Sequence, residues 1–419
     1  MNSTRMRLIK FKPVALICLF LLMLCFSLWG SINSPLTAAE KTPLIAFSSL
    51  SGRGQQLRNG LFTIKPNGQG RKLLTPTLED IGSPLVWSSN GQRIAFIGNY
   101  VPYIVNTNGS SLKQLLKDTS CYRPPSYDIR WLPDSKQIAF TQSCDGSTME
   151  DPGALRLYLS ETTKKQGTKL IQDFTSATSS GLFLSPNGKR VAFVKDNDIY
   201  VMNTDGSQTI NLTKKPGDYS SGGNPLSWSP DGTRIAFYMG KYPQQQLYVI
   251  NADGSNLTNL TNNPENQVYN LNVAWSPDSK RIAFYHSESG DNLGTKQNIY
   301  LVDAKGGKPI NLTNKPGEYN ELSWSPDGQQ IAFTVGELSQ QKIYTIQPNG
   351  RGLTNLTRNP FSSIFLGWAT DSKRIAFTAD RGSLGSAIYI INRDGSGLRK
   401  LTKNGDVNDF FPTWQPLSR

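Results

Sequence analysis

The sequence predicts an all-β protein, a β-propeller of eight four-stranded blades, and three observations carry this prediction. A strand that ends in tryptophan is followed at a constant offset by an Ile-Ala-Phe strand, as in Trp228 to Ile235 and Trp324 to Ile331. The Ile-Ala-Phe or Val-Ala-Phe runs recur along the chain at intervals of 44 to 53 residues. The two ends of the chain each carry an incomplete unit. A repeat of this period made of four short strands is typical of a propeller blade.

The chain begins with a predicted targeting segment, residues 1–39. Basic residues precede an apolar run from Val14 to Trp29, and Thr37-Ala38-Ala39 supplies small side chains before Glu40. Because this run is shorter than the roughly 20 residues of a spanning helix, a cleaved signal peptide is favoured over an uncleaved membrane anchor. Either way, residues 40–419 are expected to form one exported propeller domain, periplasmic or otherwise extracytoplasmic.

The net charge and the histidine content limit the classes of function that the protein could have. The chain has 44 Lys and Arg against 31 Asp and Glu, and the part after residue 39 still carries a net charge of +9. This excess favours anionic surroundings such as envelope polymers or lipid headgroups, while export argues against nucleic acid. The one histidine, His286, excludes a zinc site of several imidazoles, and we expect it in an exposed loop. No metal or cofactor is expected.

Each unit contains four predicted strands, named a to d in chain order. Strand a ends in Trp, strand b is Ile-Ala-Phe, strand c resembles Ile-Tyr-Val, and strand d ends in Leu-Thr. Ser-Pro-Asp-Gly turns join a to b, with an aspartate expected to bond nearby backbone amides, and Asp-Gly or Asn-Gly turns join c to d. We expect the tryptophan to pack between blades, since Leu184 replaces it in one unit.

The two incomplete units predict how the ring closes. Ile45 has no tryptophan strand before it, and Trp414 has no Ile-Ala-Phe strand after it. Joined, they make an eighth blade whose innermost strand is C-terminal and whose other three strands are N-terminal, a 1+3 closure. Such a closure leaves no open sheet edge. Seven blades are the alternative if the terminal pieces do not pair.

These motifs resemble those of a known family. The Trp-Ser-Pro-Asp-Gly, Ile-Ala-Phe and Ile-Tyr-Val series over residues 42–416 is similar to the TolB-type, WD-like propeller repeat. The resemblance implies a propeller fold and a periplasmic binding or scaffold role. The same repeat occurs in the propellers of prolyl-oligopeptidase-like enzymes. We expect this chain to lack both the small α/β domain of TolB and the α/β-hydrolase domain of those peptidases.

The two faces of the predicted ring differ. The a–b and c–d turns are short and uniform, and we call their side the short-turn face; the longer b–c and d–a connections form the long-loop face. Variable loops on a rigid ring commonly carry binding sites. The d–a loops bring acidic and aromatic residues to the start of strand a, and the candidate binding residues are Asp80, Tyr127, Asp128, Asp218, Tyr219, Glu265, Tyr269, Glu318, Tyr319, Asp409 and Phe410. Together they could take a cationic peptide, a cation or a sugar; alternatively, the carboxylates cap turns and pair with lysines.

Two function classes follow. The first is a non-catalytic, monomeric exported propeller that binds a protein, a peptide or an anionic envelope polymer on its long-loop face. The second is an enzyme that acts on an anionic glycan, with Asp128, Asp218 and Glu318 as acid and base. Because no nucleophile–base set or cofactor motif is present, we predict binding and assign no catalytic residue. The membrane would be reached only through an uncleaved anchor.

Two smaller features complete the sequence. Cys121 and Cys144 flank one strand and are a candidate disulfide in an oxidising compartment, with two free thiols as the alternative. Asn-Leu-Thr triplets that match the glycosylation sequon begin at Asn211, Asn256, Asn259, Asn311 and Asn355. The repetition of strand d explains these triplets without any sugar.

Overall fold

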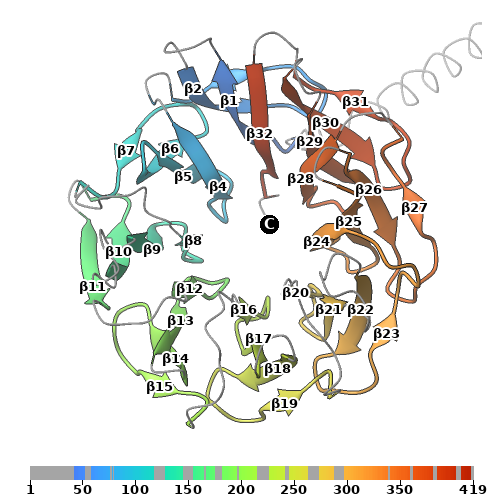
Figure 1. Cartoon of the computed structure of the whole chain (residues 1–419). Helices are drawn as coiled ribbons and strands as arrows, with labels where there is room; N and C mark the ends of the chain where they lie inside the picture. The colour runs from blue at the N-terminus through green and yellow to red at the C-terminus, as the bar shows by residue number, and fades with distance from the viewer. Residues whose placement is uncertain are drawn as a thin grey trace, which may run out of the picture. The chain divides into compact units, whose positions relative to one another are not determined.

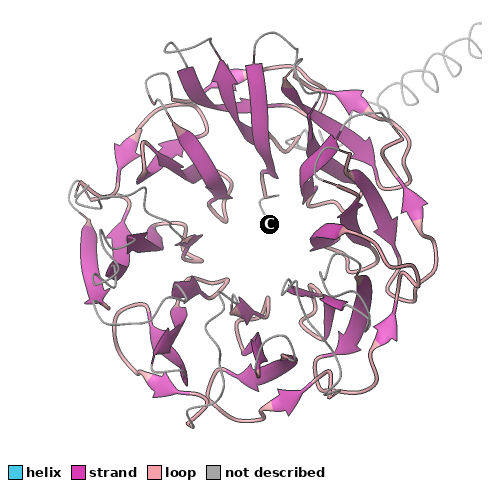
Figure 2. Ribbon diagram, in the orientation of Figure 1, coloured by secondary structure: helices cyan, strands magenta, loops and turns pink. Residues whose placement is uncertain are grey.

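All regular structure in the described part of the protein is β-strand. The computed structural model describes residues 42–51, 58–75, 78, 80–117, 128–144, 154–164, 167–174, 182–195, 198–214, 226–240, 245–262, 273–286, 297–337, 340–358, 362–380, 385–402 and 407–416. Within these ranges Figure 2 shows strands and loops only, so the predicted all-β class is confirmed. The predicted targeting segment, Cys121 and the side chain of Cys144 lie outside the described residues. None of the described residues forms a helix that could span a bilayer.

The strands form eight antiparallel sheets of four, arranged as a propeller (Figure 1). We number the blades so that blade 1 holds β32 and β1–β3, blade 2 holds β4–β7, and each later blade holds the next four strands, up to β28–β31 in blade 8. The innermost strands, which correspond to strand a, are β4 (Ile81–Trp87), β8 (Ile129–Trp131), β12 (Leu182–Leu184), β16 (Ser227–Trp228), β20 (Val273–Trp275), β24 (Tyr319–Trp324), β28 (Ser362–Trp368) and β32 (Val407–Trp414).

The other three strands of each blade follow outward from the innermost one. Strand b is β1 (Ile45–Ser51), β5 (Arg93–Gly98), β9 (Gln137–Cys144), β13 (Arg190–Lys195), β17 (Arg234–Met239), β21 (Arg281–His286), β25 (Ile331–Val335) and β29 (Arg374–Asp380). Strand c is β2 (Arg58–Ile64), β6 (Val101–Asn106), β10 (Ala154–Glu161), β14 (Asp198–Asn203), β18 (Gln246–Asn251), β22 (Asn298–Asp303), β26 (Lys342–Ile346) and β30 (Ser386–Asn392). Strand d is β3 (Lys72–Leu73), β7 (Lys113–Gln114), β11 (Thr168–Asp173), β15 (Ile210–Asn211), β19 (Thr258–Asn259), β23 (Ile310–Asn311), β27 (Thr354–Asn355) and β31 (Arg399–Lys400).

The ring closes as the sequence predicts, with eight blades rather than seven. The sheet of blade 1 has the order β3-β2-β1-β32, so the C-terminal strand is innermost and three N-terminal strands complete the blade (Figure 1). Ile45 pairs with Trp414, as Ile235 pairs with Trp228 within blade 5. The terminal strands therefore reproduce the register of a continuous blade.

The alternation of side chains along strand b builds the packing between blades. In blade 5, Ile235 and Phe237 pack against Val194 and Ile199 of blade 4, whereas Ala236 packs against Trp275 of the next blade. Successive strand residues point to opposite faces of a sheet, so Ile and Phe meet the preceding blade while the small alanine leaves room for the next tryptophan. The core is thus a series of clusters between neighbouring blades rather than one central cluster.

The tryptophans link seven of the eight blades to the preceding blade, which confirms their predicted packing role. The indole Nε1–H of Trp275 donates to the carbonyl of Ser227, 3.1 Å away, and that of Trp324 donates to Ala274 at 2.9 Å. Trp87, Trp131, Trp228, Trp368 and Trp414 make the equivalent bond. A buried indole N–H normally needs such a partner.

Hydrogen bonds between turns define the short-turn face. The N–H of Ala252, in the c–d turn of blade 5, donates to the carbonyl of Thr233 in the a–b turn of the same blade, and Thr204 donates likewise to Lys189 in blade 4. The aspartates of the a–b turns act as predicted, since Asp231 accepts the Thr233 N–H and Asp278 accepts the Lys280 N–H. The two sets of short turns therefore lie on one face, as expected for a meander.

Strand d explains four of the five Asn-Leu-Thr triplets. The side-chain amide of Asn211 donates to the hydroxyl of Tyr200 on β14, and its oxygen accepts the N–H of Thr213. The same pair of bonds occurs at Asn259, Asn311 and Asn355. These asparagines tie strand d to strand c, as the repetition of the motif suggests.

Candidate functional site

The residues just before the inner strands β4 and β24 join the two sets of loops on the long-loop face. The carbonyl of Asp80 accepts the N–H of Asn99 at 2.8 Å, and that of Glu318 accepts the N–H of Gly336 at 2.9 Å. Asn99 and Gly336 each follow strand b of the same blade, so the d–a and b–c connections meet on this face. Asp80 and Glu318 therefore lie on the face opposite the short turns.

Five of the predicted binding residues are outside the described part of the chain: Tyr127, Asp218, Tyr219, Glu265 and Tyr269. They belong to d–a connections of blades 3, 5 and 6. The convergence of all eleven candidates on one mouth stays a prediction.

Among the described candidates, Asp80 and Glu318 are exposed. Asp80 uses its backbone N–H to bond the side-chain oxygen of Asn99 at 3.1 Å, which fixes the loop while its own carboxylate faces solvent. The two carboxylates stand before β4 and β24, on blades 2 and 7. Exposed carboxylates held on a rigid backbone are suitable contacts for a cationic partner.

Asp128 has structural partners on two blades. Its Oδ2 accepts the backbone N–H of Leu184 on blade 4 at 3.1 Å, and its Oδ1 lies 3.3 Å from the guanidinium of Arg130. Its backbone carbonyl accepts the N–H of Thr141. The carboxylate thus joins neighbouring blades, which is the alternative role weighed for these residues.

Tyr319 and Asp409 are buried, with 7% and 1% of their surface exposed. The Tyr319 hydroxyl donates to the carbonyl of Lys315 and its ring packs edge-on against Phe333. Asp409 pairs in register with Ser49, and burial raises the pKa of its carboxyl although the hydroxyls of Ser49 and Thr402 oppose that shift. These two side chains support their own blades, so neither is on the surface that a partner would meet.

Phe410, beside Asp409 on β32, is half-buried and lies 6.0 Å from Phe411, centroid to centroid. Phe411 itself adopts a φ of 57° at an irregularity in the pairing of β1 and β32. A positive φ is uncommon for an aromatic residue. The bulge turns this part of the innermost strand away from regular pairing.

Sequence reasoning missed Glu321, which occupies the same kind of position on β24. Glu321 has a φ of 53° at the irregularity between Asn320 and Ser323, three residues before Trp324 as Phe411 is three before Trp414. Burial raises the pKa of its carboxyl. Burial, and then the charge of Glu321, also raise the pKa of the Tyr285 hydroxyl on blade 6. Only the bulge brings this carboxyl to the blade junction, and the strand pattern alone does not show a bulge.

The prediction that His286 lies in an exposed loop is wrong. The residue ends β21, is 8% exposed, and its ring lies edge-on to Tyr300 at 5.1 Å. Strand b continues past the Ile-Ala-Phe motif in this blade because the register with β22 extends to the His286–Asn298 pair. In the described part of the chain, no group of three or more His, Cys, Asp or Glu residues is placed to hold a metal ion.

Comparison with known proteins gives the family of this eight-bladed propeller. Residues 151–294 and 274–418 match the model of the TolB beta propeller domain, and the two matches together span more than half of the chain. The protein therefore belongs to the TolB β-propeller domain family, and the resemblance predicted from the repeat motifs is confirmed.

Individual relatives are more distant. A protein TolB homolog of Chlorobium luteolum (strain DSM 273 / BCRC 81028 / 2530) is 29% identical over 184 residues, which cover 42% of this chain and 36% of the relative. The chain spans about a third of the length of the curated relatives it matches. Their whole-protein activities therefore do not transfer with the match.

Two solved structures share the fold at low identity. Porphyromonas gingivalis dipeptidyl peptidase 4 gives a TM-score of 0.57 at 16% identity, over 77% of this chain and 54% of that one. An oligogalacturonate lyase in complex with manganese gives a TM-score of 0.53 at 14% identity, over 83% of this chain and 96% of that one. At these identities the likeness concerns the fold, which serves in binding proteins and enzymes alike.

Proposed function

We propose that this protein is an exported, non-catalytic propeller that binds a protein, a peptide or an envelope polymer on its long-loop face. The observation that carries the proposal is the difference between the two faces. The short turns repeat one pattern of hydrogen bonds from blade to blade. The connections on the other face vary: β5 and β6 are joined by Asn99 and Tyr100 alone, whereas residues 145–153 join β9 to β10.

Three further features support the proposal. The matched family contains TolB propellers, for which a binding role is the expectation stated above. Asp80 and Glu318 expose their carboxylates on that face. The sequence of residues 1–39 has the form of an export signal. We favour binding over catalysis because no nucleophile–base set occurs in the sequence; the peptidase and lyase likenesses concern the fold.

The test is affinity capture from an envelope extract with three forms of the full-length protein. One is unchanged, one carries Asp80→Ala, Asp218→Ala, Glu265→Ala and Glu318→Ala, and the third carries Lys136→Ala and Lys373→Ala on the short-turn face. Asp128 and Asp409 stay intact because their contacts support the fold. We expect one partner to be retained by the first and third forms and reduced tenfold or more by the second.

Equal recovery on all three forms would place the site elsewhere and contradict the proposal. Shortening of an anionic glycan by the unchanged protein, lost in the fourfold variant, would favour the enzyme instead. Circular dichroism and thermal unfolding of each form verify beforehand that the ring is intact.

A further inference from the structure

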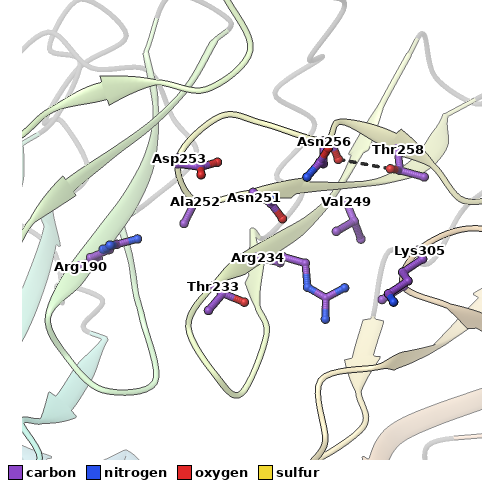
Figure 3. Close-up of a pocket in the computed structure, with 11 residues that line it drawn as sticks. Arg190, Thr233, Arg234, Val249, Asn251, Ala252, Asp253, Asn256, Thr258 and Lys305 are labelled. Carbon is purple, nitrogen blue, oxygen red and sulfur yellow. Dashed lines mark hydrogen bonds between the residues drawn. The ribbon is translucent and has the colours of Figure 1, made fainter.

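A groove crosses blade 5 on the short-turn face, away from the loops discussed above (Figure 3). Its volume is about 750 Å³, within the usual range for ligand sites. It runs from Arg190 of blade 4 to Lys305 of blade 6, over the a–b and c–d turns of blade 5. Two of its residues depart from the repeat, and both departures bring positive charge to the groove.

Lys305 stands where six other c–d turns have Asp or Asn. In those turns the side-chain oxygen accepts the N–H two residues further on, at 2.9–3.0 Å; the residues are Asn67, Asn108, Asp205, Asp253, Asn349 and Asp394. In blade 6 the preceding Asp303 caps the turn instead, accepting the Lys305 N–H at 2.8 Å. The exposed Lys305 side chain is therefore not needed by the turn.

Arg190 is the second departure. Four other arginines at the start of strand b stack on the tryptophan of the next blade, with guanidinium-to-ring distances of 5.0–5.2 Å: Arg93 on Trp131, Arg234 on Trp275, Arg281 on Trp324, and Arg374 on Trp414. Within the described blades, no such stacking joins Arg190 to Trp228. Arg190 is exposed and lines the groove, on the side of Asp253 (Figure 3).

Arg234 adds a third cation at the Lys305 end. Its Nη2 donates to the carbonyl of Ser279, which with the Trp275 ring holds the guanidinium in place. The equivalent Arg93 also uses Nη1, which donates to the hydroxyl of Thr162. Blade 6 has Ala304 at the position that Thr162 occupies in blade 3, so Arg234 lacks the second hydrogen bond that Arg93 makes. Figure 3 shows the ends of Arg234 and Lys305 directed toward each other.

Converging like charges favour a bound anion, because an oxyanion between them replaces repulsion with charge-assisted hydrogen bonds. Between the cationic ends the lining includes the uncharged polar residues Asn251, Asn256 and Thr258, together with the apolar Val249, Ala252 and Ala304. Amide and hydroxyl groups of this kind bond the hydroxyls of a ligand, whereas Arg and Lys bind carboxylate or phosphate. Asp253 is the one acidic residue that lines the groove.

We propose that this groove binds an anionic oligosaccharide or polyol chain, with its acidic groups held by Lys305 and Arg234 at one end and by Arg190 at the other. The hydroxylated part of the ligand lies along Asn251 and Asn256. The proposal concerns the face opposite the long loops and stands independently of the function proposed there.

The experiment is calorimetric titration of the full-length protein with four probes of equal length. Tetramannuronate tests carboxylates, a glycerol-phosphate tetramer tests phosphates, mannotetraose is the neutral control, and tetraglutamate is the acidic peptide control. The variants are Lys305→Asp, Arg190→Gln and Lys373→Asp. Lys305→Asp restores the residue type found in other c–d turns, so it should fold, and Lys373→Asp makes the same charge change on the same face in blade 8.

We expect at least one acidic probe to bind, and its affinity to fall tenfold or more in Lys305→Asp and in Arg190→Gln while staying within twofold in Lys373→Asp. The acidic probe that binds more tightly identifies the acidic group. The proposal is overturned if neither acidic probe binds, if both groove variants bind like the unchanged protein, if Lys373→Asp weakens binding as much, or if tetraglutamate or mannotetraose binds as tightly.

Discussion

The junction between blades 3 and 4 differs from the junction between blades 5 and 6, although both close the same ring. At the second, Trp275 donates to the carbonyl of Ser227, and Arg234 stacks on its ring at 5.2 Å. At the first, Leu184 stands in place of the tryptophan and Gln137 in place of the arginine. There the carboxylate of Asp128 accepts the N–H of Leu184.

This difference shows that the tryptophan is a polar link as well as a space-filling side chain. When leucine takes its place, the volume is largely kept but the hydrogen bond between blades is lost. A carboxylate from the preceding blade then supplies another bond. A residue that the sequence suggested for binding is thus used to hold the ring together.

The largest expected loss of stability comes from removing one of the tryptophans that link neighbouring blades. Trp275→Ala deletes the indole from a cluster that includes Ala236 and Ile282 and removes the bond to Ser227. We expect a loss of about 3–5 kcal/mol in the free energy of unfolding, typical of a buried aromatic side chain. Urea unfolding followed by circular dichroism measures it. A loss smaller than that of Leu184→Ala in the same assay would contradict the role given to the indole.

A smaller loss is expected at the other junction. Asp128→Ala leaves the N–H of Leu184 without its carboxylate partner and should cost about 1–3 kcal/mol. Asp128→Asn keeps an acceptor oxygen and should cost less. The control is Glu318→Ala, which removes an exposed carboxylate from the residue just before β24 and should change stability by no more than about 0.5 kcal/mol. Equal losses of stability from Asp128→Ala and Glu318→Ala would contradict the structural role given to the Asp128 carboxylate.

The repeat determines how much of the fold could be predicted from the sequence. The offset from Trp228 to Ile235 is one antiparallel pair across a tight turn, and Ile45 and Trp414 show the same register between the two ends of the chain. Blade number and closure are therefore encoded in motifs that occur in every unit. Features common to all units are set by local pattern and need no knowledge of neighbouring blades.

The site was less predictable because it depends on departures from that pattern. Nothing beside Asp409 in the sequence shows that Ser49 bonds its carboxyl, since Ser49 lies at the other end of the chain. The bulge at Glu321 is likewise set by pairing with β25. Lys305 could have been singled out from the sequence, since alignment of the c–d turns shows a lysine where Asp or Asn is usual.

The smallest effect concerns Glu321, a carboxyl at the junction of blades 6 and 7 where the tryptophan link is present. Trp324 already donates to Ala274, and among the described residues the Glu321 carboxylate has no hydrogen bond or ion pair. Burial raises the pKa of this carboxyl, so the folded state favours its neutral form. As pH rises through the usual glutamate range, the unfolded chain releases its proton first and folding stability falls.

Glu321→Gln removes this titration while keeping the size of the side chain. We therefore expect the variant and the unchanged protein to have similar stability near pH 4 or below, and the variant to be the more stable at pH 7, with the difference appearing above the unfolded pKa of about 4.3. Urea unfolding of both proteins across this range measures the difference. A variant less stable at pH 7 would mean that the charged carboxylate has a favourable partner, as that of Asp128 does. The effects on folding stability expected for the Asp128 and Glu321 carboxylates are therefore opposite in sign. A carboxylate stabilises a blade junction where it replaces a missing hydrogen bond between blades, and it opposes folding where the tryptophan already makes that bond.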